Sequence, residues 1–126
     1  MYAKGDHMKR VVLLNALPLN AIPYERFAIQ VNRLSPDAFE YSILEDVERG
    51  YEIVSYIRHK ATVDLLSKML NVEIKVSSEL YKYQENDLIY IVTLKPEKIQ
   101  RGQEATDLKL EDLVFYYVAV AKGVWL

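Results

Sequence analysis

Several features that support common enzyme mechanisms are missing from this sequence. It contains no cysteine, which excludes disulfides, cysteine metal sites and thiol nucleophiles. Its four glycines form no phosphate-binding loop, and neither a metalloprotease histidine pair nor a serine elbow is present. No apolar run approaches the roughly 20 residues that a membrane-spanning helix needs. We therefore expect no membrane partner and a location in the cytoplasm.

The net charge is also small, because the sequence has 16 basic and 18 acidic residues, and the isoelectric point is near 5.7. A general basic coat for duplex nucleic acid is absent, so we expect no stable duplex partner. Any anionic ligand should be small. With 51% hydrophobic and 27% charged residues, the chain has the composition of an ordinary globular domain.

The first seven residues, 1–7, read as a remnant of recombinant expression, because a second methionine follows at Met8. We expect a single domain spanning 8–126, since this length suits one core and is too short for two. Without His7, the chain has one histidine, His59. A multi-histidine metal site within one subunit is therefore excluded, and we expect no metal.

The hydrophobic pattern predicts an α/β fold, with a mixed β-sheet of about five strands and helices packed on it. One helix is predicted from the Ser35 cap to Gly50. A second begins at about His59 and ends at Leu70, where Asn71 can adopt a left-handed closing conformation. Apolar runs and alternating patterns predict strands at 10–17, 26–34, 51–57, 72–76, 87–94 and 113–121.

The stretch "SYIRHKATVDLL" places Arg58, His59 and Lys60 at the start of the second helix. Helices usually prefer acidic residues there, because their free N–H groups already make that end positive. Extra positive charge suggests a bound anion such as a phosphate. His59 is either an exposed residue without a role or a group that protonates a departing oxygen, and the local sequence leaves both open.

Other candidates also have two interpretations. Lys95, Lys98 and Arg101 belong to the polar segment 95–112, which is either a solvated loop or a lid over an anion, with Arg101 contacting phosphate oxygens. Asn15 interrupts the first apolar strand and is either a structural hydrogen-bonding residue or a ligand contact. Most of the ten tyrosines should lie in the core or on the sheet, and one or two could stack on a base.

Three stretches, "LLNALPLNAIP", "SYIRHKATVDLLSKMLNVEI" and "YQENDLIYIVTL", together resemble the small archaeal-virus and phage proteins described as anti-CRISPR ring nucleases. The resemblance runs over about 11–94. It implies a virus-encoded homodimer in the host cytoplasm that cleaves cyclic tetra-adenylate without a metal and so counteracts type III CRISPR defence. The implied products are linear di-adenylates with 2′,3′-cyclic phosphate ends.

The resemblance also implies a set of site residues. His59 would be the catalytic acid, and the ring would be held by a first loop, by the start of the second helix and by a later basic loop. The implied substrate-binding residues are Asn15, Leu17, Pro18, Asn20, Arg58, Lys60, Thr62, Lys98 and Arg101.

This sequence departs from the family pattern at three places. The family often has a small residue at the position of Arg58 and a serine at that of Pro18. In the later loop it has an arginine followed three residues on by a glutamate, where this chain has Lys98 and Arg101. Glu104 could replace that glutamate only if the loop shifts.

The implied reaction is compatible with these residue types. A ribonucleotide 2′-hydroxyl can attack the neighbouring phosphorus in line, so the protein need only supply geometry, positive charge and a proton for the 5′-oxygen. This calls for neither a metal nor a cofactor, and a twofold ring matches a twofold dimer. Two alternatives are a protein that sequesters cyclic oligoadenylate without cleaving it and a small nucleic-acid-binding regulator, against which the acidic isoelectric point argues.

Overall fold

The structure is a computed structural model that describes residues 9–98 and 108–123. The elements follow in the order β1 (Arg10–Leu14), η1 (Leu19–Ala21), β2 (Phe27–Leu34), α1 (Pro36–Glu48), β3 (Glu52–Ser55), α2 (Lys60–Leu70), β4 (Leu88–Leu94), η2 (Pro96–Lys98), η3 (Leu110–Asp112) and β5 (Leu113–Lys122). Within these two ranges, no helix is both long enough and apolar enough to cross a bilayer.

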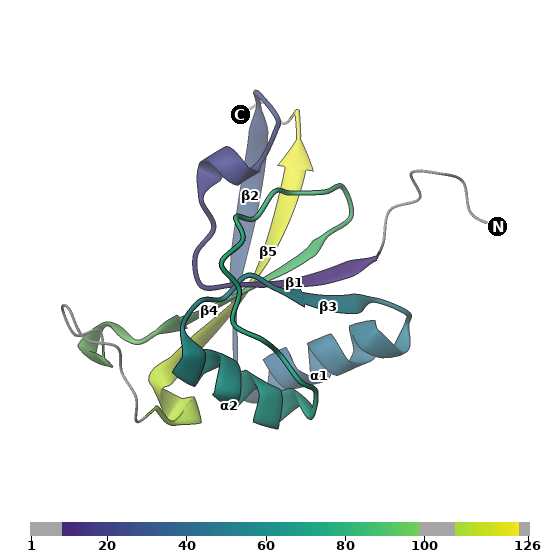
Figure 1. Ribbon diagram of the computed structural model, residues 1–126. Coiled ribbons are helices and arrows are strands. Elements are labelled where there is room, and N and C mark those ends of the chain that lie inside the picture. Colours follow the sequence, from purple (N-terminus) through teal and green to yellow (C-terminus); the bar gives the residue numbers. More distant parts are fainter. Residues whose placement is uncertain (1–8, 99–107, 124–126) are drawn as a thin grey trace.

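The strands form one five-stranded sheet in the order β2-β5-β4-β1-β3 (Figure 1). β1 runs parallel to both of its neighbours, β3 and β4, whereas β5 runs antiparallel to β2 and β4. The predicted α/β domain with a mixed sheet of about five strands is therefore confirmed.

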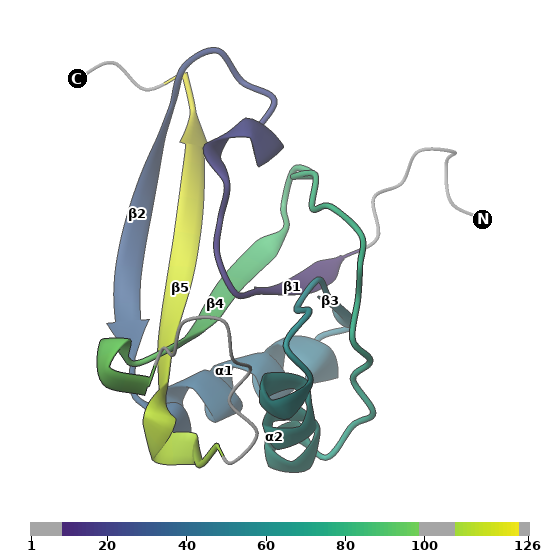
Figure 2. The same ribbon diagram turned by 60° about the vertical axis from the view of Figure 1, so that its left-hand side comes forward.

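Both helices lie on the same face of the sheet, and the loop that carries η1 lies on the other (Figures 1 and 2). All five residues of β1 are buried, as expected for a central strand covered on both faces. Val11 and Leu13 belong to the core beneath the helices. Val12 and Leu14 belong to a second cluster on the opposite face.

The helix boundaries follow the predicted signals. The Ser35 hydroxyl accepts a hydrogen bond from the Ala38 backbone N–H at 3.1 Å and so caps α1. Asn71 closes α2 in the left-handed region, at φ 55° and ψ 42°. Gly50, just after α1, has a φ of +100°, which glycine adopts without the steric cost of a side chain.

Two strand predictions need correction. The first strand ends at Leu14 rather than Leu17, so Asn15 is an exposed residue beyond the strand and not a buried one within it. Residues 72–76 are not a strand. The Ile74 backbone N–H donates to the Ser67 hydroxyl at 3.0 Å, so this segment is attached to the end of α2.

Candidate functional site

A pocket of about 350 Å³ lies where the parallel strands β1 and β3 end. It is lined by residues 14–18, Tyr56, Arg58 and residues 79–81. Ligands of α/β sheets typically bind outside the carboxyl ends of parallel strands. A larger groove of about 800 Å³ runs beside β3 and residues 72–79, but it contains none of the predicted site residues. The smaller pocket is therefore the candidate site.

Four of the predicted binding residues line this pocket: Asn15, Leu17 and Pro18 from the first loop, and Arg58 from the β3–α2 connection. The Arg58 guanidinium donates to the Ser78 carbonyl at 3.4 Å, and the side chain remains exposed. The fold thus brings two segments that are about forty residues apart into one site. A cation lies at its rim, where an anionic group would gain from it.

His59, which follows Arg58, is the N-cap residue of α2. Its Nδ1 atom lies 2.8 Å from the Thr62 hydroxyl oxygen and accepts from the Thr62 backbone N–H at 3.3 Å. Thr62 is only 4% exposed, so its visible role is to hold the imidazole, and its predicted contact with substrate stays a prediction. Because Nδ1 faces Thr62, a proton passed to a ligand would have to leave from Nε2.

The other predicted site residues that the structure describes, His59, Asn20, Lys60, Thr62 and Lys98, do not line the pocket. Asn20 lies exposed in η1. Lys60 forms an exposed ion pair with Asp64, with 3.1 Å between Nζ and Oδ2. Arg101 lies outside the described residues, as does Glu104.

Lys98, at the end of η2, has its Nζ 3.5 Å from Oδ1 of Asp112. The Lys109 backbone N–H donates to the other Asp112 oxygen at 2.9 Å. That hydrogen bond, together with the positive charge of Lys98, lowers the pKa of Asp112. Lys98 therefore helps to anchor the η2–η3 region, whether or not it also contacts a ligand.

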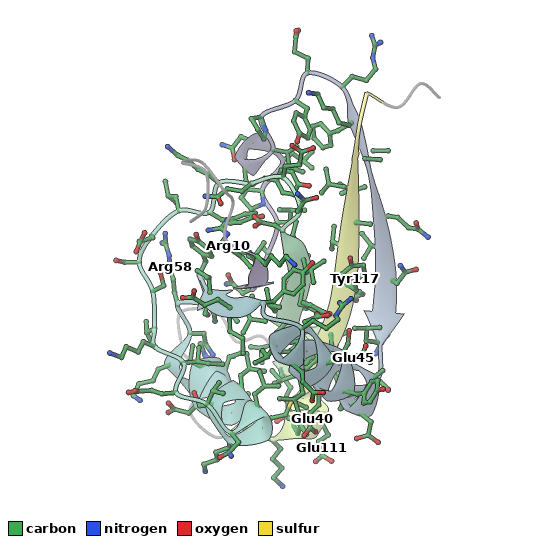
Figure 3. All side chains as sticks on the ribbon, turned by 90° about the vertical axis from the view of Figure 1, so that its right-hand side faces the viewer. Arg10, Glu40, Glu45, Arg58, Glu111 and Tyr117 are labelled. Atoms are coloured by element: carbon green, nitrogen blue, oxygen red, sulfur yellow. The ribbon has the colours of Figure 1, made fainter. Side chains whose placement is uncertain are left out.

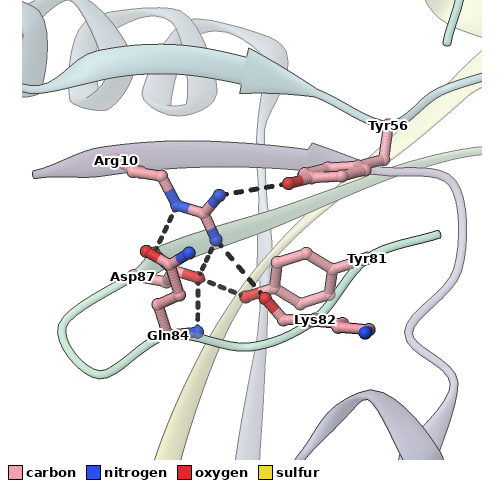
Figure 4. Close-up of polar contacts among 6 residues, drawn as sticks. All are labelled: Arg10, Tyr56, Tyr81, Lys82, Gln84 and Asp87. Carbon is pink, nitrogen blue, oxygen red and sulfur yellow. Dashed lines mark hydrogen bonds and ion pairs between the residues drawn. The ribbon is translucent and has the colours of Figure 1, made fainter. Parts of the chain in front are cut away.

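A buried polar network beside the pocket was not anticipated from the sequence (Figure 4). Arg10 donates from Nε and Nη2 to the two carboxylate oxygens of Asp87, at 2.9 and 2.7 Å. Asp87 also accepts from the Tyr81 hydroxyl at 2.7 Å and from the Gln84 backbone N–H at 3.0 Å. The Tyr56 hydroxyl accepts from Nη1 of Arg10 at 3.1 Å. Two pocket-lining tyrosines are thereby tied to one ion pair.

Within this network, the interactions with Asp87 help to keep Arg10 and Tyr81 protonated. Hydrogen bonding to Asp87 raises the pKa of Arg10 above its already high value. Burial, followed by the bond to Asp87, raises the pKa of Tyr81 well above that of an exposed tyrosine. Both groups therefore stay protonated throughout the physiological range, and the carboxylate they bind has a permanent counter-charge.

Charge around the pocket is sparse. Arg58 and Glu79 are the only charged residues among the described residues that line it. The labelled carboxylates Glu40, Glu45 and Glu111 lie below Arg58 in the view of Figure 3. In the described ranges, no group of three or more histidine, cysteine or acidic side chains is arranged to hold a metal ion. The geometry thus offers a mixed site with one cation, amide and apolar groups, and tyrosine rings.

Comparison with known proteins supports the fold. A family model described as STIV B116-like matches residues 11–117. Among solved structures, B116 of Sulfolobus turreted icosahedral virus (STIV) superposes with a TM-score of 0.67 and 20% sequence identity, covering 86% of this chain and 97% of that chain. Identity at this level shows a shared fold and nothing finer. No curated protein matches this sequence.

Proposed function

This chain belongs to the STIV B116-like family, and on that premise we propose that it is a viral ring nuclease that cleaves cyclic tetra-adenylate without a metal. The observation that carries the proposal is the pocket at the ends of β1 and β3. It unites Asn15, Leu17 and Pro18 with Arg58, directly before the capping His59. All of these residues lie in two of the stretches that resemble anti-CRISPR ring nucleases, and Pro18 and Arg58 differ from the serine and the small residue that this family often has there.

The pocket residues suit the recognition of a nucleotide. Arg58 presents a planar guanidinium that can contact phosphate oxygens, and the amide of Asn15 can bond to a base edge or a ribose hydroxyl. The tyrosine rings and Leu17 supply apolar surface for a base. A volume of about 350 Å³ is at the small end of the range for ligand sites, so one pocket would hold roughly one nucleotide unit of the ring.

The cleavage step needs one proton donor. The 2′-oxygen forms a bond to phosphorus, the bond from phosphorus to the 5′-oxygen breaks, and the 2′-hydroxyl proton passes to water. The leaving 5′-oxygen takes a proton from Nε2 of the His59 imidazolium. In this charged form Nδ1 carries a proton, so it donates to the Thr62 hydroxyl, 2.8 Å away, and no longer accepts from the Thr62 backbone N–H. Two such cuts on opposite sides of the ring give two linear di-adenylates with 2′,3′-cyclic phosphate ends.

The test separates catalysis from helix capping. His59→Ala removes both the imidazole and the cap. His59→Asn retains a side-chain oxygen that can accept from the Thr62 N–H but cannot act as an acid. We expect both variants to bind cyclic tetra-adenylate and neither to cleave it, measured by resolving products in chelator with cyclic tri-, tetra- and hexa-adenylate as substrates. Turnover by His59→Asn equal to the parent's would disprove the general-acid role.

In the same assay, binding and product formation by the parent protein distinguish the proposed function from its alternatives. Tight ring binding without any products would identify a sequestering protein. Failure to bind any ring, together with binding to long nucleic acid that weakens steeply with salt, would identify a nucleic-acid-binding regulator, because counterion release governs such contacts.

A further inference from the structure

One wall of the pocket is aromatic. Tyr56 and Tyr81 both line it, and their ring centroids lie 5.2 Å apart at an interplanar angle of 63°. Tyr81 is only 6% exposed, so little of its ring is open to a ligand. Tyr56 is half-buried and directly precedes the connection that carries Arg58. It is therefore the ring that a ligand in the pocket can reach.

Hydrogen bonds to Arg10 and Asp87 hold these two tyrosine side chains in place. The Tyr56 hydroxyl accepts from Arg10, the Tyr81 hydroxyl donates to Asp87, and Arg10 and Asp87 hold each other through two hydrogen bonds (Figure 4). No buried side-chain polar atom in the described part of the chain lacks a partner. A ring held at its edge and at its hydroxyl loses little further freedom when a ligand packs on it, which favours affinity.

A need for stability alone does not explain the ion pair. Arg10 and Asp87 have side chains that are 7% and 1% exposed, and replacing such a buried pair with apolar residues is often neutral or stabilising. What the charges provide is a defined geometry, because each hydroxyl must point at one partner. That geometry is applied to the two tyrosines that line the pocket.

We infer that Tyr56 is the base-stacking residue of the pocket, against which one adenine of the ligand packs, and that the Arg10–Asp87 ion pair positions its ring. Arg58, two residues further along, then meets the phosphate next to that base. This inference rests on the proposed function, since it assigns a part of the cyclic nucleotide to each residue. It accounts for an aromatic side chain beside a cation in one small site, as nucleotide binding requires.

The experiment compares Tyr56→Phe with Tyr56→Leu. Both variants lose the same hydroxyl and the same bond to Arg10, so they differ only in whether an aromatic ring is present. Binding of cyclic tetra-adenylate is measured by calorimetry in the His59→Asn background, where no turnover is expected. We expect Tyr56→Phe, which keeps the ring but loses the bond to Arg10, to bind several-fold more weakly than the parent. We expect Tyr56→Leu to bind on the order of 10-fold more weakly than Tyr56→Phe.

A matched control uses Tyr83, which packs against the same face of the sheet but does not line the pocket. Tyr83→Leu should leave the affinity unchanged. If Tyr56→Leu does not fold, as judged by circular dichroism, Tyr56→Met takes its place, because its flexible chain fills irregular space without an aromatic face. Positioning is tested with the double variant Arg10→Met, Asp87→Leu, which should stay folded and yet bind the ring several-fold more weakly.

Each outcome decides one point. If the parent does not bind the ring, the proposed function fails and this inference fails with it. If the parent binds, but the phenylalanine and leucine variants bind equally well, Tyr56 does not stack on a base and the proposed function stands. If the Arg10 and Asp87 double variant binds as tightly as the parent, the ion pair does not position Tyr56.

Discussion

Replacing Asp87 by alanine should be one of the most damaging single substitutions in the described part of this protein. Its carboxylate accepts two hydrogen bonds from Arg10, one from Tyr81 and one from the Gln84 backbone. The variant leaves a guanidinium whose side chain is 7% exposed without a counter-charge. Breaking a buried pair in this way costs about 3–5 kcal/mol.

This loss is large against the total stability of a domain, which is typically about 5–15 kcal/mol. It should lower the melting temperature by roughly 10–20 °C in a domain of this size. Urea denaturation followed by far-ultraviolet circular dichroism should show a lower midpoint with an unchanged slope. An unchanged slope matters, because it means that the unfolded states of the two proteins are comparable.

Two controls sharpen the measurement. Asp64 forms an ion pair with Lys60 in which both side chains are mostly exposed, so Asp64→Ala should cost under about 1 kcal/mol. The double variant Arg10→Met, Asp87→Leu should recover most of the stability that Asp87→Ala loses, because no charge is left unpaired. If Asp87→Ala costs no more than Asp64→Ala, the described burial of the pair is wrong.

Three further predictions concern the basic loop, assembly and alkaline pH. Replacing Lys98 and Arg101 together by alanine should weaken cyclic tetra-adenylate binding by about 2–5 kcal/mol, measured by titration at two salt concentrations, and unchanged ring affinity would refute the lid. We expect a homodimer, because edge strand β2 exposes the apolar residues Ile29 and Val31. Light scattering should then give twice the chain mass of 14.7 kDa, and a monomer would exclude a site shared across a dimer. Burial raises the pKa of Tyr81 and Tyr90, so the folded state keeps protons that the unfolded state loses above about pH 10. The free energy of unfolding should therefore fall as pH rises past that value in urea titrations, and a flat profile would contradict it.

Local sequence predicted the elements whose signals are local. The Ser35 cap and the Asn71 closing residue act within one helical turn, so composition and position sufficed. β1 was recognisable because a strand covered on both faces is a continuous apolar run. Its end was placed three residues late because Ala16 and Leu17 extend the apolar run into the loop, where the structure uses them to line a pocket.

Longer-range features were not predictable in this way. Residues 72–76 alternate as a strand does, but a strand also needs a hydrogen-bonding neighbour, and the Ile74 N–H bonds to Ser67 instead. The Arg10–Asp87 pair depends on the register between β1 and β4, which sets Val11 opposite Leu88. The sequence signal was a charged residue at the start of each of the predicted strands 10–17 and 87–94, although only the pairing of those strands brings the charges together.

The position of β1 in the sheet has a consequence for how the chain folds. β1 is synthesised first, yet its partner β4 follows 77 residues later in the register that pairs Arg10 with Asp87. β2 likewise cannot form its hydrogen bonds with β5 until β5, the last of the five described strands, has been synthesised. Until the ribosome has released β4, an apolar segment destined for the centre of the sheet has no partner on one side. Chains dominated by such distant pairings fold in milliseconds to seconds rather than microseconds, so a newly made chain depends on rapid completion of synthesis to shield this strand from aggregation.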